Sequence, residues 1–137
     1  MIPTNESVGY YLHIFKHFNN CYFNNSLPQP KIKVTPSHDF VGYCSYTQSG
    51  RQRYNYTITL SSCYDMSEEC LDGVILHEMI HLFLFYNHIE DNGDHGREFT
   101  KIAKRFNRDG WNISATVNDR SLVELNKPKK KHWWSIF

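Results

Sequence analysis

The chain has 137 residues, of which 40% are hydrophobic and 15% aromatic, and its formal net charge is +1 at pH 7. This length allows one hydrophobic core, and the near-zero charge excludes a protein that binds polyanions through bulk electrostatics alone. No apolar run is long enough to cross a membrane. Residues 1–6 lack the basic and apolar stretches of a secretory signal, so we expect a cytoplasmic protein with reduced, buried cysteines.

The first expected element is a helix over about residues 6–22. Its apolar side chains recur at intervals of three and four residues, as on one face of a helix: Leu12, Phe15, Phe18 and Tyr22. A polar loop at residues 24–30 follows the helix and ends it.

Three strands are expected next, because apolar and polar residues alternate at 31–35, 41–47 and 54–60. Residues 48–51 predict a hairpin turn between the second and third strands. In the third strand one face is predicted to carry Tyr54, Tyr56, Ile58 and Leu60. The sequence therefore predicts a small, mostly antiparallel sheet, and it leaves open which strand lies at the edge.

A long helix is expected over residues 67–86, which contain no proline and a single glycine, Gly73. Ser67, followed by two glutamates, is typical of an N-cap with acidic residues in the first turn. Apolar residues occur around most of the helix, so we expect it to be buried on most faces.

The most informative segment of this helix is the pentapeptide H-E-M-I-H at residues 77–81. Positions i and i+4 of a helix lie on one face, about 6 Å apart along the axis, so His77 and His81 can bind the same metal ion. Glu78 lies at the edge of that face, where it can accept a proton from an activated water molecule. Two core histidines bonded to backbone carbonyls are the alternative, and the adjacent glutamate argues against it.

Two residues are candidates for a third ligand, His88 and His95. On a continuous helix His88 would lie roughly 10 Å beyond His81, which is too far for one ion with bonds of about 2.1 Å. His95 follows an Asn-Gly turn signal that can bring the chain back over the helix. The next helix starts directly after it and has an apolar face: Phe99, Ile102, Ala103 and Phe106. This context favours His95 as the ligand over a plain loop histidine.

With these residues in place, the chain resembles the SprT-like domain of zinc metallopeptidases. The family carries an H-E-x-x-H helix, a third histidine in a short H-G-x-E-F segment and an upstream F-N-x-x-L-P segment. The similarity covers roughly residues 10–112. It is carried by the matching stretches 23–28, 77–81 and 94–99, together with Gly42 and the strand at 58–61.

The resemblance implies an α+β, zincin-like fold: an N-terminal helix, a small sheet, the H-E-x-x-H helix and a helix with the third ligand at its start. It implies that His77, His81 and His95 bind one Zn²⁺ ion, and that Glu78 is the general base in peptide-bond hydrolysis. A protein or peptide substrate can pair with the edge of the sheet. An oxyanion-stabilising group is also needed, and the candidates are Tyr43, Tyr46, Tyr54 and Tyr56.

The sequence also departs from the family pattern. Many members carry a C-terminal zinc ribbon with paired C-x-x-C motifs, but no two cysteines here have that spacing: Cys21, Cys44, Cys63 and Cys70. The resemblance is therefore to a minimal form of the family. We expect a SprT-like domain at residues 1–126 and a basic, aromatic tail at 127–137.

Two basic features bear on partners. The tail has a lysine-rich run at 127–131 before His132, Trp133 and Trp134, and the last expected helix has an outer basic face: Arg97, Lys101, Lys104, Arg105 and Arg108. Such features suit single-stranded nucleic acid or a membrane surface, although charge runs most often only solvate a surface. Eukaryotic relatives act on proteins crosslinked to DNA, which favours DNA as a partner, while the missing ribbon argues against it.

Two functions remain compatible with the sequence. The first is a zinc-dependent endopeptidase. The second is a non-enzymatic, zinc-stabilised module that binds nucleic acid or protein. Glu78 favours the first, because a structural zinc site needs no acid beside its ligands and normally has four protein ligands.

Overall fold

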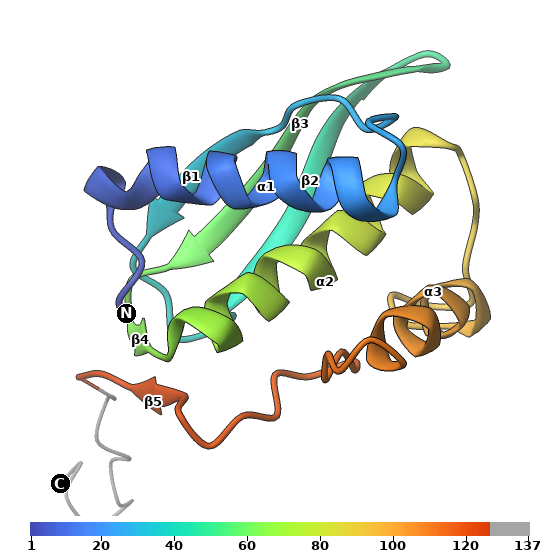
Figure 1. Ribbon diagram of the computed structural model, residues 1–137. Coiled ribbons are helices and arrows are strands. Elements are labelled where there is room, and N and C mark those ends of the chain that lie inside the picture. The colour runs from blue at the N-terminus through green and yellow to red at the C-terminus, as the bar shows by residue number, and fades with distance from the viewer. Residues whose placement is uncertain (127–137) are drawn as a thin grey trace, which may run out of the picture.

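The computed structural model describes residues 1–126 and has an α+β fold (Figure 1). The elements in chain order are η1 (Asn5–Ser7), α1 (Val8–Tyr22), β1 (Lys31–Thr35), β2 (Gly42–Ser49), β3 (Gln52–Ser61), β4 (Tyr64–Asp65), α2 (Glu68–Tyr86), α3 (Arg97–Asn107) and β5 (Val123–Glu124). Helices α1 and α2 pack against each other and against the three-stranded sheet. The α+β prediction is therefore confirmed. The predicted tail at 127–137 lies outside the described residues.

The main sheet has the strand order β1-β3-β2. Strands β2 and β3 are antiparallel and are joined by a tight turn in which Gly50 adopts a φ of 61°, a conformation that favours glycine. Strand β1 pairs in parallel with β3, with Ile32 opposite Ile58. The antiparallel prediction is thus confirmed for one pair and wrong for the other, because β3 inserts between the two strands that precede it. Strand β2 is left at an edge.

Strand β3 contains a bulge that the sequence pattern did not predict. The pairing shifts by one residue across Ser45 and Thr47 of β2, and Asn55 adopts a φ of 53°. An extra residue reverses the alternation of side chains beyond it. Tyr54 is accordingly 45% exposed, and Arg53 turns toward α2, where its Nη1 donates to a backbone carbonyl in the last turn at 2.8 Å. The prediction that Tyr54 shares one face with Tyr56, Ile58 and Leu60 is therefore wrong.

Helix α2 is buried on most faces, as predicted. Ser67 is its N-cap, and the Ser67 side chain accepts a hydrogen bond from the backbone of Cys70 at 3.1 Å. Six apolar side chains of the helix have an exposed fraction of 0%: Leu71, Ile75, Leu76, Met79, Ile80 and Leu82. Burial of each such side chain contributes roughly 1.5–3 kcal/mol, so α2 is fixed mainly by the core.

After α3 the chain returns across the start of α2. Asn107 holds this return, because its side chain donates to the carbonyl of Ile113 at 2.9 Å and accepts from the Ile113 amide at 2.7 Å. The chain then pairs β5 with β4 in a two-stranded sheet. Strands of two residues have no periodic pattern, so the sequence did not predict this sheet.

The four cysteines are free, as predicted. Their predicted burial is correct only for Cys70, since Cys44 and Cys63 are half-buried and Cys21 lies exposed on α1. No helix among residues 1–126 combines the length and the apolar character needed to cross a membrane.

Candidate metal centre

The three predicted histidines converge at one point. Nε2 of His95 lies 3.1 Å from Nε2 of His77 and 3.2 Å from Nε2 of His81. All three candidate ligand atoms lie within 4.8 Å of one another, and no other group of His, Cys, Asp and Glu within residues 1–126 is arranged in this way. His77 and His81 come from adjacent turns of α2, and His95 lies just before α3. His88, which follows the end of α2, is not part of the cluster.

The geometry of the three nitrogen atoms suits a cation better than a hydrogen-bond network. An imidazole nitrogen has one in-plane position, which holds either a lone pair or a hydrogen atom. Nε2 of His95 can therefore form a hydrogen bond with only one of its neighbours at 3.1 and 3.2 Å. A cation at the centre can accept a lone pair from all three imidazoles. Neutral nitrogen donors in this number fit zinc.

The imidazoles of His77 and His81 are held in the neutral form. Burial lowers the pKa of His77 to about 3 and that of His81 to about 4, and repulsion within the histidine cluster acts in the same direction. A backbone hydrogen bond with Ser114 opposes the shift at His77, and the charges of Asp94 and Asp91 oppose it at His81. Neutral imidazoles present the lone pairs that a metal needs.

Phe99 of α3 forms the floor of the cluster. Its ring centroid lies 4.8, 4.9 and 4.7 Å from the rings of His77, His81 and His95, and the residue is 2% exposed. Helical spacing predicted that Phe99 faces inward. The spacing did not predict the contact with the histidines, because periodicity gives the buried face of a helix and not its partners.

Glu78 lies beside the histidine cluster and lines the same cleft. The residue is only 4% exposed, and this burial raises the pKa of its carboxyl group to about 8. A carboxyl group in such surroundings holds a proton more readily than an exposed one, whereas a neighbouring cation would favour its ionised form. The chemistry available here is proton transfer next to a metal site.

The cleft around these residues runs between the start of β2 and the segment after α3. Phe40, Gly42 and Tyr43 line one side, and Thr116 and Val117 line the other. A Cβ at Gly42 would come within 3.2 Å of both the Thr59 carbonyl and the Val74 side chain, so glycine lets β2 approach α2 closely. The edge strand therefore lies directly beside the histidine cluster.

Among the four tyrosines considered as oxyanion donors, only Tyr43 lines this cleft. Tyr43 is 42% exposed and packs edge-on against Phe40, with ring centroids 4.7 Å apart. Tyr46 instead packs against Phe85 and under the guanidinium of Arg53. The remaining two, Tyr54 and Tyr56, lie outside the cleft lining.

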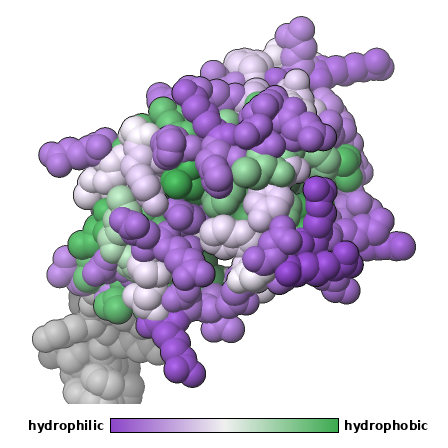
Figure 2. All heavy atoms as spheres, in the orientation of Figure 1, coloured by the Kyte–Doolittle hydropathy of each residue, from purple (hydrophilic) through white to green (hydrophobic). Residues whose placement is uncertain are grey.

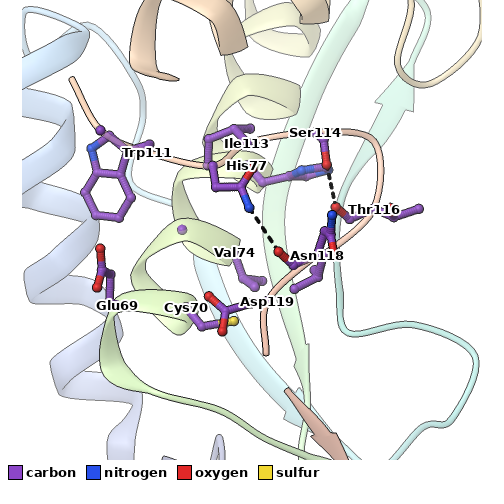
Figure 3. A pocket seen from close by; sticks show the side chains of 14 residues that line it. Glu69, Cys70, Val74, His77, Trp111, Ile113, Ser114, Thr116, Asn118 and Asp119 are labelled. Carbon is purple, nitrogen blue, oxygen red and sulfur yellow. Dashed lines mark hydrogen bonds between the residues drawn. The ribbon is translucent and has the colours of Figure 1, made fainter. Parts of the chain in front are cut away.

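A second pocket lies between the start of α2 and the segment at 111–119 (Figure 3). His77 points toward this segment from α2, and it lines both pockets. Two hydrogen bonds fold the segment: Asn112 Nδ2 donates to the carbonyl of Asn118 at 2.9 Å, and Ser114 Oγ donates to the carbonyl of Thr116 at 2.7 Å. The folded segment therefore covers one side of the His77 side chain.

The predicted basic face is present on α3. Four cationic side chains lie on the helix and a fifth, Arg108, is its C-cap, and all five are exposed: Arg97, Lys101, Lys104, Arg105 and Arg108. Only Lys101 has a nearby acid among the described residues, with Nζ 3.9 Å from Oε1 of Glu98. Figure 2 shows a strongly hydrophilic surface on the side where α3 lies.

Comparison with known proteins finds one family and several relatives that match most of the chain. The model of the SprT-like family matches residues 11–119. The DNA-dependent metalloprotease SPRTN of Xenopus tropicalis is 35% identical over 126 residues, which are 88% of this chain and 28% of that protein. Human SPRTN is 33% identical and Caenorhabditis elegans dvc-1, also named a DNA-dependent metalloprotease, is 32% identical, each over 88% of this chain. The chain spans 24% of the human protein and 33% of the nematode protein.

Proposed function

The chain belongs to the SprT-like family, and on that premise we propose that it is a zinc-dependent metallopeptidase that hydrolyses peptide bonds. One observation carries the proposal: three imidazoles converge beside a buried carboxyl group in a cleft bordered by an edge strand. This arrangement combines a place for a metal, a group that can move a proton and a surface for an extended peptide.

His77, His81 and His95 would hold a single zinc ion through their Nε2 atoms. When bound, zinc supplies Lewis acidity, which lowers the pKa of water toward neutrality and polarises a carbonyl group. Three protein ligands rather than four are typical of catalytic zinc sites, because a position remains open. This count supports the enzyme over the non-enzymatic binding module.

Glu78 would act as the general base and then as the general acid. Its carboxylate takes the proton of the attacking water and passes that proton to the leaving amine of the substrate. The burial of Glu78 beside the cluster excludes bulk water from the carboxylate. The carboxylate therefore binds the transferred proton more strongly than an exposed one would.

The substrate would bind as an extended peptide along β2. Strand β3 occupies one edge of β2, and within residues 1–126 no strand pairs with the other edge. Backbone groups at such an edge accept an added strand. Segments of unfolded protein are therefore the favoured substrate class.

DNA-associated proteins are a further part of the proposal. The relatives are named DNA-dependent metalloproteases, and α3, which starts at the metal centre, presents four exposed cations, with a fifth at its C-cap. Nucleic acid bound to this face would hold attached proteins near the cleft.

Charge reversal tests this part of the proposal. Changing Lys104 and Arg105 to glutamate should weaken the binding of single-stranded DNA and reduce the salt dependence of that binding. Changing Lys31 and Lys33 on β1 to glutamate is the control, and it should alter neither the affinity nor the salt dependence.

The free cysteines support a reducing compartment, and we propose the cytoplasm. Residues 1–126 would form the catalytic domain. A fusion of the chain to a fluorescent protein, imaged in cells, checks the location. A retained peptidase activity of the 1–126 fragment checks the domain boundary.

The enzyme proposal is tested by metal analysis together with proteolysis assays on unfolded and DNA-bound proteins. We expect one zinc per chain, and we expect Glu78→Gln to keep the zinc while hydrolysis falls by about 10²–10⁴-fold. His95→Ala should lose the zinc, and the matched control His88→Ala should keep it. Equal inactivity of wild type and Glu78→Gln would favour the binding module. Absence of metal, with no effect of His95→Ala, would exclude both functions.

A further inference from the structure

The loop between α2 and α3 contains a carboxylate that the proposed chemistry does not use. Asp91 accepts hydrogen bonds from four backbone amides. Its Oδ1 accepts from Asn92 at 3.1 Å and Glu98 at 3.0 Å. Its Oδ2 accepts from Gly96 and Phe99, both at 3.0 Å. One side chain thus connects both ends of the loop to the first turn of α3.

These hydrogen bonds replace the side-chain cap that the N-terminus of α3 lacks. The N-cap residue is Gly96, which has no side chain to accept from the helix. The first amides of a helix have no partner within the helix, and the carboxylate of Asp91 satisfies those of Glu98 and Phe99 from outside it. Negative charge at this end also interacts favourably with the helix dipole.

The same hydrogen bonds bracket the third histidine. Asn92 lies three residues before His95, and Gly96 lies directly after it. The amide of Phe99 belongs to the residue whose ring packs against all three imidazoles at 4.7–4.9 Å. Asp91 therefore fixes the backbone of His95 and the aromatic floor of the metal centre together.

Gly96 is needed for this arrangement. A Cβ at this position would lie 2.4 Å from Oδ1 of Asp91 and 2.6 Å from the carbonyl oxygen of Asn92. Both distances are far below ordinary van der Waals contact. The glycine that follows His95 leaves the space that the carboxylate occupies.

We propose that Asp91 is a positioning residue of the metal centre. Its carboxylate holds the backbone around His95, so that the imidazole is already in place to bind the metal. This inference rests on the proposed function, because it requires that the three histidines bind a metal. Groups that orient a metal ligand typically change metal affinity by 10–100-fold when they are removed. Asp91 should act on metal affinity and on ligand geometry without touching metal or substrate.

The test compares the wild-type 137-residue chain with Asp91→Ala, Asp91→Asn and the matched control Glu90→Ala, which removes a neighbouring exposed acid. Zinc affinity is measured by competition with a chromophoric chelator, and the cobalt-substituted protein reports the ligand set through its visible absorption. We expect Asp91→Ala to bind zinc 10–100-fold more weakly, with a changed cobalt spectrum. Asp91→Asn should lie between, since an amide oxygen still accepts hydrogen bonds and an amide nitrogen does not. Glu90→Ala should match wild type.

Unchanged zinc affinity and cobalt absorption in Asp91→Ala would overturn the inference while the metal site stands. A lower thermal midpoint of the metal-free protein, with an unchanged cobalt spectrum, would indicate a merely structural role and would also overturn it. If Asp91→Ala does not fold, the Asp91→Asn variant decides by the same two measurements. If wild type itself binds neither zinc nor cobalt, the proposed function fails and the inference fails with it.

Discussion

His77 and His81 lie in the middle of α2, a 19-residue helix, whereas His95 lies in a loop before α3. The helix is held by apolar side chains that have no exposure to solvent. The loop is held by hydrogen bonds to one carboxylate. Burial of many side chains spreads stability over the whole fold, while a few polar contacts stabilise only their neighbourhood. The two parts of the centre should therefore respond differently to the same disturbance.

The largest expected effect comes from a cavity in the helical part. Ile80 lies between Met79 and His81 and is 0% exposed. Ile80→Ala should lower the free energy of unfolding by about 2–5 kcal/mol, because it removes buried contacts and leaves a cavity. Urea denaturation monitored by circular dichroism measures this change. A loss below about 1 kcal/mol would contradict the view that burial fixes α2.

A smaller effect is expected from the loop part. Gly96→Ala places a methyl group against Asp91, so the loop must shift, and we expect a loss of about 1–3 kcal/mol together with weaker zinc binding. Ile80→Ala variants that remain folded should bind zinc nearly normally, which separates the two parts. Chelator competition and denaturation of both variants make the comparison. Normal zinc affinity in Gly96→Ala would contradict the proposed role of Asp91 as a positioning residue.

Removal of zinc should affect the two parts unequally. Without the ion the loop loses the contact that ties His95 to α2, so amide protection around His95 and Phe99 should fall by about tenfold or more, while the middle of α2 stays protected. Hydrogen exchange of the zinc-loaded and metal-free protein measures this difference. Equal loss of protection in α2 would show that the metal, and not the core, fixes that helix.

The smallest effect is a gain in stability. Gly73 lies inside α2, and a Cβ there would come no closer than 3.9 Å to any neighbour. Gly73→Ala should raise the free energy of unfolding by about 0.5–1 kcal/mol, since alanine favours a helix over glycine. Thermal denaturation checks this expectation. The contrasting control is Gly42→Ala, which should destabilise because its Cβ would lie 3.2 Å from the Thr59 carbonyl.

The difference between the regular helix α2 and the irregular loop around His95 also explains how much of the structure the sequence predicts. Helix α2 and the face of α3 follow from caps and periodic apolar residues, so Ser67 and Phe99 were placed correctly. His95 was located by elimination of His88 and by the start of a packed helix. The irregular parts gave weaker signals, because a loop has no repeating pattern.

Three features could not be predicted for identifiable reasons. The bulge at Asn55 adds one residue without changing the apolar composition of β3. The pairing of β4 with β5 involves two residues on each side, which is too few for a period. Asp91 bonds to backbone amides up to eight residues away, and backbone amides leave no trace in a sequence.

The bulge in β3 also has a consequence for how a bound polypeptide would be aligned. Because the extra residue turns Arg53 inward, its guanidinium both bonds to the last turn of α2 and lies 4.6 Å over the ring of Tyr46 on β2. Arg53 thereby joins the hairpin and the histidine-bearing helix at their outer ends. In the proposed enzyme, a chain seated on β2 keeps a constant offset from the zinc ion. If the proposed function holds, a single inserted residue in the central strand contributes to the choice of the peptide bond that is cleaved.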